Sequence, residues 1–357
     1  MSSGAPMAFM LAGGTGGHVY PALALARELR ERGFRLRWIG SRRGLEKRVV
    51  GAAQIPLHQL PMRGLRGKGL WQQLVALVLL GVSLIWSVLL MLRYRPALVV
   101  GMGGYASVPA ALAAWLTRRP LVLQEQNAVA GSANRALGKF ARAIATGFPD
   151  VLTEQGKATY LGNPVRDDLL QVATTHPWQW DGERPLQVLV LGGSLGARPL
   201  NEAVPVVAAA FGERCQWWHQ CGNDHEEATR DAYASVKQWR VDAFLEDMAA
   251  AYAWADLVIC RAGALTVAEV AATGRPAILV PLPHAIDDHQ RANAKFLTNA
   301  GAGLSLEQDR LRDELPLLLA RFLEAPASLG AMAAKSLSCG RPRATRDIAD
   351  LAEGLLS

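Results

Sequence analysis

The sequence predicts an α/β protein built from two Rossmann-like, doubly wound parallel-sheet domains that face each other across a cleft. Short apolar runs end in glycine-rich loops, and helical segments follow these loops. This order of strand, glycine loop, helix and strand is typical of βαβ units. It occurs in both halves of the chain, and 357 residues, 50% of them hydrophobic, suffice for two buried cores.

In the first half, residues 7–12 form an apolar strand that ends in the loop 13–18, with the sequence Gly-Gly-Thr-Gly-Gly-His. Alanine and leucine spacing predicts a helix over 20–32, which Gly33 ends. The expected elements that follow are strand 34–39, strand 97–100, helix 110–116 and strand 121–123.

The second half repeats this order. Residues 186–191 are an apolar strand that leads into the glycine loop 192–196. Two further strands, 257–260 and 277–280, lead into a small-residue turn and a proline-rich loop. The linker between the halves is expected near 164–166.

The net charge of +7 conceals an asymmetry between the halves. Residues 1–165 contain 20 Lys and Arg against 6 Asp and Glu, a net +14, whereas residues 166–357 contain 18 against 25, a net −7. The basic half favours an anionic partner such as nucleic acid, a phospholipid surface or a phosphorylated substrate, unless its charges only solvate the surface. The ten tryptophans form no interleaved aromatic and basic platform, which argues against nucleic acid. Four cysteines without a CxxC spacing indicate a reducing cytoplasm rather than a disulfide framework or a zinc site.

Residues 74–92 carry no charge over 19 positions and are apolar on every side. Such a segment is either a membrane span or a helix buried all round. Basic residues flank it on both sides, so the positive-inside rule indicates no orientation.

The loop 13–18 has the residue types that let a backbone approach an anion, because glycine is permissive and a helix N-terminus offers free N–H groups. A tight structural turn is the alternative. The loop is neither a Walker A sequence nor G-x-G-x-x-G, and Gly40-Ser41-Arg42-Arg43 stands where a dinucleotide site needs an acid, which argues against NAD. Loop 192–196 and turn 261–266 are two further candidate anion sites.

Two titratable residues stand beside these loops. His18 could orient a phosphate or accept a proton, unless it is structural. Glu269 could accept hydrogen bonds from both hydroxyls of a ribose, or serve only as a partner of the helix dipole. The cluster of His284, Asp287, Asp288 and His289 is not expected to bind a metal, because no helical register aligns it.

Seven segments together resemble the MurG family of bacterial glycosyltransferases, in order and over nearly the whole chain. They are GGTGGH (13–18), GMGGYAS (101–107), QEQNAVAG (124–131), GNPVR (162–166), GGSLGA (192–197), the long and specific block 244–276, and PHAIDDHQRANA (283–294). The resemblance implies a GT-B fold and inverting transfer of N-acetylglucosamine (GlcNAc) from UDP-GlcNAc to the 4-hydroxyl of the muramyl sugar of lipid I, which gives lipid II. It also implies an acceptor and membrane-docking domain at 1–165, a donor domain at 166–340, and a final helix, 341–357, that packs back on the first domain.

The site residues implied by the resemblance divide by substrate. In the donor domain, Phe244 and Leu245 would meet the uracil, Glu269 the ribose, and Arg166 would lie near the donor. The diphosphate would lie at Ser194 and the turn of Ala264, Leu265 and Thr266, and Val267 and Ala268 would also belong to the substrate site. Gln290 and Asn127 would contact the GlcNAc, and Thr15, Gly16, Gly17 and His18 would close over the reacting centre. His18 is the expected catalytic base, with Glu125 behind it, and helix N-termini could stabilise the departing UDP without a metal or cofactor.

The resemblance also suggests where the chain acts. A true span at 74–92 would put loops 13–18 and 101–105 on opposite sides of a bilayer, yet both belong to one sheet edge. We therefore expect a helix or helical hairpin that docks on anionic phospholipid at the cytoplasmic face of the inner membrane. The expected docking residues are Arg63, Arg66, Lys68, Trp71, Leu74, Leu79, Trp86, Arg93 and Arg95.

The expected partners are UDP-GlcNAc, undecaprenyl-linked lipid I, the membrane surface and other proteins of cell-wall synthesis, with no nucleic acid. The alternatives are a transferase with another lipid acceptor such as diacylglycerol, a UDP-GlcNAc 2-epimerase, or a membrane-docked regulator that binds a UDP-sugar.

Overall fold

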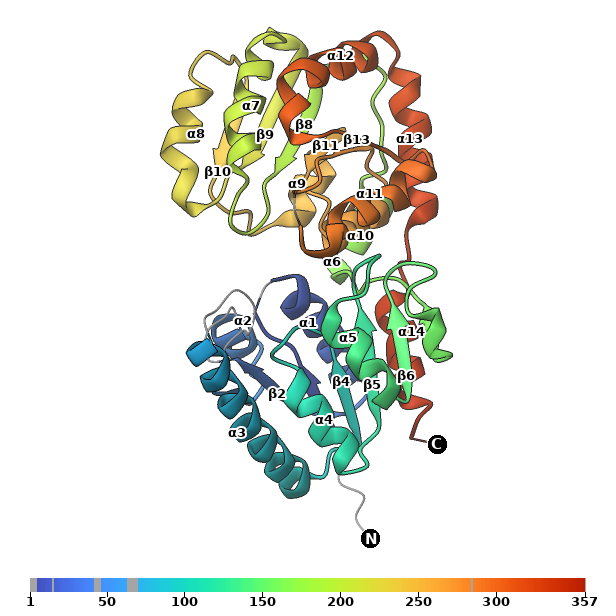
Figure 1. The fold of residues 1–357 in the computed structure, drawn as a ribbon. Helices are drawn as coiled ribbons and strands as arrows, with labels where there is room; N and C mark the ends of the chain where they lie inside the picture. Colours follow the sequence, from blue (N-terminus) through green and yellow to red (C-terminus); the bar gives the residue numbers. More distant parts are fainter. Residues whose placement is uncertain (1–4, 15, 42–45, 63–69, 284, 357) are drawn as a thin grey trace. The chain divides into compact units, whose positions relative to one another are not determined.

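A computed structural model describes residues 5–14, 16–41, 46–62, 70–283 and 285–356, and the chain divides into two compact units (Figure 1). The first unit contains Met1–Pro164 and Arg343–Ser357, and the second contains Val165–Pro342. Each is built around one parallel sheet, so the predicted pair of doubly wound α/β domains is confirmed.

The sheet of the first unit has seven parallel strands in the order β3-β2-β1-β4-β5-β6-β7. Their bounds are β1 Met7–Leu11, β2 Arg35–Ser41, β3 Leu57–Leu60, β4 Leu98–Gly101, β5 Leu121–Glu125, β6 Ala143–Thr146 and β7 Ala158–Tyr160. The central strands β1, β4 and β5 are apolar and almost fully buried, as expected of parallel strands covered on both faces.

Two layers of helices cover this sheet (Figure 1). One contains α1 Gly16–Glu31, α2 Glu46–Ala52 and α14 Ala344–Glu353, and the other contains α3 Leu70–Tyr94, α4 Val108–Leu116 and α5 Ser132–Leu137. The last helix, α14, lies on α1, and Ile348, Ala349 and Ala352 belong to the core of this unit.

The second unit has six parallel strands in the order β10-β9-β8-β11-β12-β13. Their bounds are β8 Leu186–Leu191, β9 Cys215–Gln220, β10 Trp239–Asp242, β11 Leu257–Cys260, β12 Ala277–Leu279 and β13 Gly303–Ser305. One face carries α7 Arg198–Ala209, α8 Glu226–Ala232 and α12 Leu311–Glu324, and the other carries α6 Asp167–Thr175, α9 Met248–Trp254, α10 Ala264–Thr273, α11 His289–Asn299 and α13 Pro326–Cys339.

Strand order reverses at one point in each sheet, between β1 and β4 in the first and between β8 and β11 in the second. Loops that leave adjacent strands on either side of such a point diverge to opposite faces, which opens a crevice at the carboxyl ends of the strands. The glycine loops 13–18 and 192–196 both follow the first strand at this point.

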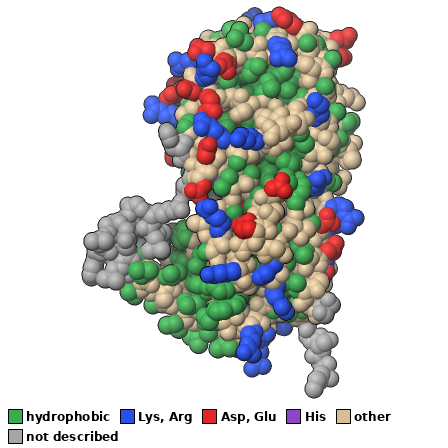
Figure 2. Space-filling view, turned by 45° about the vertical axis from the view of Figure 1, so that its right-hand side comes forward, with side chains coloured by type: hydrophobic (Ala, Val, Ile, Leu, Met, Phe, Trp, Pro, Cys, Tyr) green, Lys and Arg blue, Asp and Glu red, His purple; other side chains and the backbone are tan. Residues whose placement is uncertain are grey.

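The apolar segment 74–92 forms a single helix, α3, so the alternative of a helical hairpin is wrong. One face of α3 is buried, with the small residues Ala76, Ser83 and Ser87, and α3 packs on α4, whose buried residues are mostly alanines. Another face exposes Val78, Val82, Ile85, Trp86, Leu89 and Leu92 to solvent. The segment is thus apolar all round because the protein covers one face and leaves the other bare, and Figure 2 shows apolar side chains gathered over this part of the surface.

Candidate active site

In the first unit, the loop after β1 closes around a carboxylate of the protein itself. Glu46 Oε1 accepts hydrogen bonds from Gly14 N at 3.0 Å, Ser41 N at 3.1 Å and Ser41 Oγ at 3.0 Å. A Cβ at Gly13 would collide with this carboxylate oxygen, so the glycine there makes room for Glu46. One N–H of the predicted anion-binding loop is therefore already used within the unit.

His18 lies in the first turn of α1, because this helix begins at Gly16, earlier than the predicted start at residue 20. Its Nδ1 is 2.9 Å from Gln126 Oε1, which comes from the loop after β5. On the Cδ2 and Nε2 side, the imidazole lies beside Gly104, where a Cβ would be 3.4 Å from both atoms. The structure thus brings together the loops after β1, β4 and β5 around one imidazole.

Glu125, expected behind His18, has its oxygens in another interaction. Its Oε1 accepts from Asn127 N at 3.0 Å, and its Oε2 accepts from Gly131 N at 3.0 Å and Asn134 Nδ2 at 2.9 Å. The Glu125 side chain therefore shapes the loop that carries Asn127, and the residue hydrogen-bonded to His18 Nδ1 is Gln126 instead.

In the second unit, the loop after β8 packs tightly against the loop after β9, while Ser194 remains exposed. A Cβ at Gly196 would collide with the Cys221 carbonyl oxygen, and that oxygen accepts from Asn201 Nδ2 at 2.9 Å. Asn201 Oδ1 in turn lies 3.0 Å from Nε2 of His219, a buried imidazole whose pKa burial lowers to about 3. His219 is thus a neutral structural histidine that holds this loop in place through Asn201.

The N-terminus of α10 presents its first backbone N–H groups at the same sheet edge. Gly263 is its N-cap residue and makes no side-chain cap, and Ala264, Leu265 and Thr266 form the first turn. Such a helix end is a suitable anion site. The side chain of Val267 is fully buried, whereas Ala268 is half-buried.

Glu269 follows on the same helix and is half-buried. Tyr252 Oη donates a hydrogen bond to its Oε2 at 3.2 Å, and Arg166, the N-cap residue of α6, lies nearby. Burial raises the pKa of Glu269 to about 7, while the guanidinium of Arg166 and the hydroxyl of Tyr252 act in the opposite direction. A carboxylate in this setting gains much from hydroxyl donors that a ligand supplies.

The remaining predicted donor residues lie on neighbouring loops of this edge. Phe244 is exposed and Leu245 is buried in the loop after β10. Gln290, near the start of α11, accepts from Leu282 N at 2.9 Å through its Oε1. Arg261 ties the loop after β11 to the loop after β12 by donating to Val280 O and Pro281 O, both at 3.2 Å.

Some predicted residues fall outside the described ones. Thr15, His284, Arg63, Arg66 and Lys68 are among these, and the side chains of Trp71 and Leu74 are likewise not described. Of the other docking residues, Leu79 is half-buried, while Trp86, Arg93 and Arg95 are exposed. Among the described residues, no group of three or more His, Cys, Asp or Glu side chains is placed to hold a metal ion.

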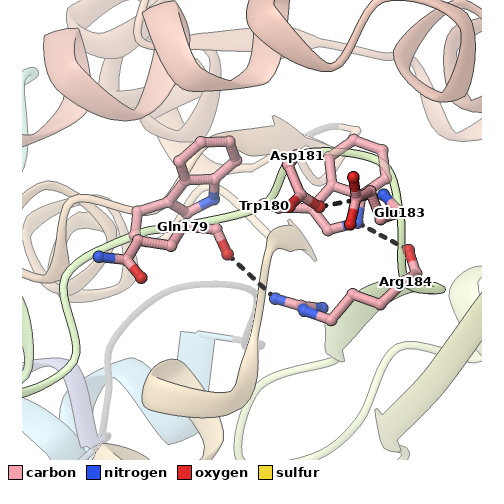
Figure 3. Close-up of a pocket in the computed structure, with 6 residues that line it drawn as sticks. Gln179, Trp180, Asp181, Glu183 and Arg184 are labelled. Atoms are coloured by element: carbon pink, nitrogen blue, oxygen red, sulfur yellow. Dashed lines mark hydrogen bonds between the residues drawn. The ribbon is translucent and has the colours of Figure 1, made fainter.

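A cavity of about 590 Å³ lies elsewhere in the second unit, in the segment that precedes β8 (Figure 3). Arg184 pairs there with Asp256 at 2.6 and 2.7 Å, and the indole N–H groups of Trp178 and Trp180 donate to backbone carbonyls. This segment enters the amino end of β8, whereas the glycine loop leaves its carboxyl end, so the cavity is separate from the candidate site.

Sequence reasoning missed Gln126, Glu46, Tyr252 and Asn201. Gln126 and Tyr252 stand inside the recognised segments 124–131 and 244–276, which is a local signal, whereas Glu46 and Asn201 lie outside all seven segments.

Comparison with known proteins now defines the class. The Glycosyltransferase family 28 N-terminal domain matches residues 8–146, and the Glycosyltransferase family 28 C-terminal domain matches residues 187–353. The chain therefore belongs to glycosyltransferase family 28.

Individual relatives narrow this class. A protein of Alkalilimnicola ehrlichii named UDP-N-acetylglucosamine--N-acetylmuramyl-(pentapeptide) pyrophosphoryl-undecaprenol N-acetylglucosamine transferase is 51% identical over 345 residues, which cover 95% of this chain and 96% of that protein. A protein of the same name from Azotobacter vinelandii is 48% identical, with 96% of each chain covered.

Solved structures agree with this. The crystal structure of Acinetobacter baumannii MurG matches with a TM-score of 0.82 and 37% identity over 98% of this chain and 99% of that one. The predicted GT-B fold is confirmed by this match. The UDP-GlcNAc 2-epimerase of Neisseria meningitidis bound to UDP-GlcNAc shares the fold alone, at 14% identity and a TM-score of 0.67 over 97% of this chain and 98% of that one.

Proposed function

We propose that this chain transfers GlcNAc from UDP-GlcNAc to the 4-hydroxyl of the muramyl sugar of undecaprenyl-linked lipid I and so produces lipid II. The observation that carries the proposal is identity of about half over nearly the whole chain to proteins named for this reaction. The class of enzyme, a glycosyltransferase with a UDP-GlcNAc donor, follows from the same relatives and from both family 28 domains.

The second unit binds the donor in this proposal. The Glu269 carboxylate accepts from the ribose hydroxyls, and the uracil lies at Phe244 and Leu245. The first turn of α10 and the loop of Ser194 receive the diphosphate through backbone N–H groups and the positive end of the helix dipole. Arg166 lies near the donor, and Gln290 contacts the GlcNAc. Backbone amides account for anion binding in a unit whose own net charge is negative.

The first unit supplies the acceptor side and the base. Gly16 and Gly17 approach the reacting centre, and His18 Nε2 accepts the proton of the acceptor hydroxyl while the hydroxyl oxygen bonds to the anomeric carbon. The bond from that carbon to the UDP oxygen breaks, and UDP leaves with the electron pair. Attack from the side opposite the leaving group inverts the anomeric carbon, and the N-termini described above stabilise the charge that develops on UDP. No step requires a metal or cofactor.

The exposed face of α3 docks the first unit on the cytoplasmic face of the membrane. Val75–Tyr94 is the one described stretch that is, by itself, long and apolar enough to cross a bilayer, but α3 also packs on α4, which covers the sheet. Spanning would therefore pull polar parts of the unit into hydrocarbon, where unpaired backbone groups are costly. Lying flat buries only the bare face, and Arg93 and Arg95 at its end meet anionic headgroups.

The acceptor is tested with radiolabelled UDP-GlcNAc and three reactions run in parallel. We expect labelled product with a lipid I analogue, none with diacylglycerol, and no UDP-N-acetylmannosamine without acceptor. Label on diacylglycerol alone would make this a transferase of another lipid, and epimerised nucleotide alone would make it an epimerase.

The base is tested with His18→Ala. We expect kcat to fall about 10²- to 10⁴-fold, the usual contribution of a general base, with the dissociation constant for UDP-GlcNAc unchanged. Unchanged turnover would remove His18 from the chemistry.

The docking face is tested with vesicles that contain phosphatidylglycerol. Ile85→Asp with Leu89→Asp should abolish cosedimentation, whereas the control Leu317→Asp, an exposed leucine on α12, should not. Retention of the double variant on the vesicles would exclude α3 as the docking face.

A further inference from the structure

A chain of buried amide side chains lies behind His18 in the first unit. Gln124, Gln126 and Asn163 are each at most 2% exposed. Gln124 Nε2 donates to Asn163 Oδ1 at 2.9 Å, and Asn163 Nδ2 donates to the backbone oxygen of Gln126 at 2.9 Å. These residues come from two of the recognised segments, 124–131 and 162–166, and the proposed function assigns them no role.

The surroundings of Gln126 allow only one orientation of its amide. Its Nε2 faces Met102 O at 3.0 Å and Gln124 O at 3.2 Å, and it also donates to Gln124 Oε1. A flipped amide would set Oε1 against these oxygen acceptors, and a buried acceptor without a donor is costly. The side-chain oxygen of Gln126 therefore faces His18.

This orientation fixes where the proton of His18 lies. An amide oxygen can only accept, so His18 Nδ1, 2.9 Å away, must be the donor. In a neutral imidazole, the lone pair is then on Nε2. That side of the ring borders Gly104, whose missing side chain leaves more room there.

We infer that Gln126 is a positioning residue that holds His18 as the Nδ1–H tautomer and so makes Nε2 the proton acceptor for the acceptor hydroxyl. The catalytic part of this inference rests on the proposed function, while the tautomer does not. An amide also differs from the carboxylate of a Ser-His-Asp triad, because it orients the ring without adding a negative charge that favours the imidazolium. Glu125, the neighbouring carboxylate, has its oxygens bound in the loop after β5.

The tautomer is measured directly by ¹⁵N spectroscopy of the imidazoles in the full chain, with the His18 signals identified by their loss in His18→Gln. We expect a protonated Nδ1 and an unprotonated Nε2 in the unsubstituted protein above neutral pH. Gln126→Met keeps the length of the side chain but removes the acceptor, so the population should shift toward Nε2–H. A wild-type His18 protonated at Nε2, or an unchanged tautomer in Gln126→Met, would overturn the inference.

Gln124→Met is the matched control. It removes a buried amide of the same size from the same row of hydrogen-bonded amides. It leaves Gln126 Nε2 its two backbone acceptors. We expect the His18 tautomer to stay as in wild type. A tautomer change as large as that in Gln126→Met would assign the effect to general packing and overturn the role of Gln126.

Kinetics then connect the tautomer to turnover. Gln126→Met should lower kcat about 10- to 100-fold, within the contribution of a general base, with KM for UDP-GlcNAc unchanged. If Gln126→Met folds poorly, the wild-type tautomer, which needs no variant, still decides the inference. If the spectra are as expected but His18→Ala retains full turnover, the tautomer assignment stands and the proposal that His18 is the base is wrong.

Discussion

The two units have sheets with corresponding strand orders around the switch point but use the crevice there in opposite ways. In the first unit, carboxylates of the protein occupy the backbone N–H groups of the loops, Glu46 at Gly14 and Glu125 at Asn127 and Gly131. In the second, the first turn of α10 has no side-chain cap. The same fold thus fills loop N–H groups with its own acids in one unit and leaves a helix N-terminus without a side-chain cap in the other.

Charge follows the same division in a counter-intuitive way. The half with net −7 contains the proposed site for an anionic nucleotide, and the half with net +14 contains the braced imidazole and the bare face of α3. Backbone dipoles act within a turn of the helix end, whereas net charge acts over the surface. In the proposed function, local amides therefore decide where the nucleotide binds, and the basic surplus of the first half faces the membrane.

The largest effect expected from this comparison concerns Glu46. Glu46→Ala leaves the N–H groups of Gly14 and Ser41 without their buried acceptor, which should lower the free energy of unfolding by about 3 kcal/mol. Denaturant unfolding with probes in each unit measures this, and UDP-GlcNAc binding should be unchanged. Glu31→Ala, at an exposed position on α1, is the control, and equal stability of the two variants would show that Glu46 does not brace the loop.

Glu269→Gln should weaken the binding of UDP-GlcNAc by the second unit without unfolding that unit. Replacing a charged acceptor by a neutral one costs about 1.5 to 3 kcal/mol, so the affinity for UDP-GlcNAc should fall roughly 10- to 100-fold in calorimetric titration. The control is Glu202→Gln, which changes an exposed glutamate paired with Arg198. This variant should bind the donor normally. Normal binding by the Glu269 variant would remove this carboxylate from the donor site.

The pH dependence of donor affinity should report the same carboxylate. Ionised Glu269 accepts more strongly from the hydroxyls than the protonated form, and its pKa is about 7. Affinity should therefore be constant above pH 8 and fall below pH 7 toward that of the neutral Gln variant, roughly 10- to 100-fold lower. Glu269→Gln should lack this dependence. A wild-type profile as flat as that of the variant would contradict the assignment.

The folding stability should change with pH in the direction opposite to that of the donor affinity. The folded pKa of Glu269 lies above its ordinary value of 4.5, so the native state binds the proton more tightly. The group's contribution to stability is therefore present below pH 4.5 and is lost as pH rises toward 7. The Gln variant should be no less stable than wild type at pH 8, and clear destabilisation there would contradict this sign.

The smallest effect concerns the ion pairs that join α1 to α14. Arg32 Nη1 lies 2.6 Å from both Asp350 Oδ1 and Glu353 Oε2, but both acids are partly exposed. Arg32→Ala should lower the free energy of unfolding by no more than about 1 kcal/mol, with less loss in high salt. A loss of several kcal/mol would mean that charge, rather than the packing of Ile348, Ala349 and Ala352, holds α14.

Sequence patterns predicted the elements that carry local signals. Apolar runs before glycine loops identified the central strands β1, β4, β8 and β11, whose burial requires continuous apolar sequence. The edge strands β3, β7, β10 and β13 escaped because they are short and only partly buried. The buried strands β6 and β9 also escaped, because β6 has only four residues and Gln and His interrupt the apolar sequence of β9. The boundary of α1 was placed too late because Pro21, within the helix, imitates a start signal.

The candidate site, like the fold, could be predicted from the sequence only in part. Glycine loops, His18 and Glu269 are visible as residue types at strand ends, but their supports come from far along the chain. Glu46 is 32 positions from Gly14, and Gln126 is 108 positions from His18. Periodicity and composition contain nothing about such pairs, since only the folded sheet brings their loops to one edge.

The helix α14 has a consequence for the order in which the protein is made. It completes the core of the first unit, yet residues 165–342 precede it on the chain. A ribosome releases the whole second unit before it releases the last helix of the first. During synthesis, an apolar face of α1 therefore stays exposed until α14 has been made. A chaperone can bind this exposed face in the meantime.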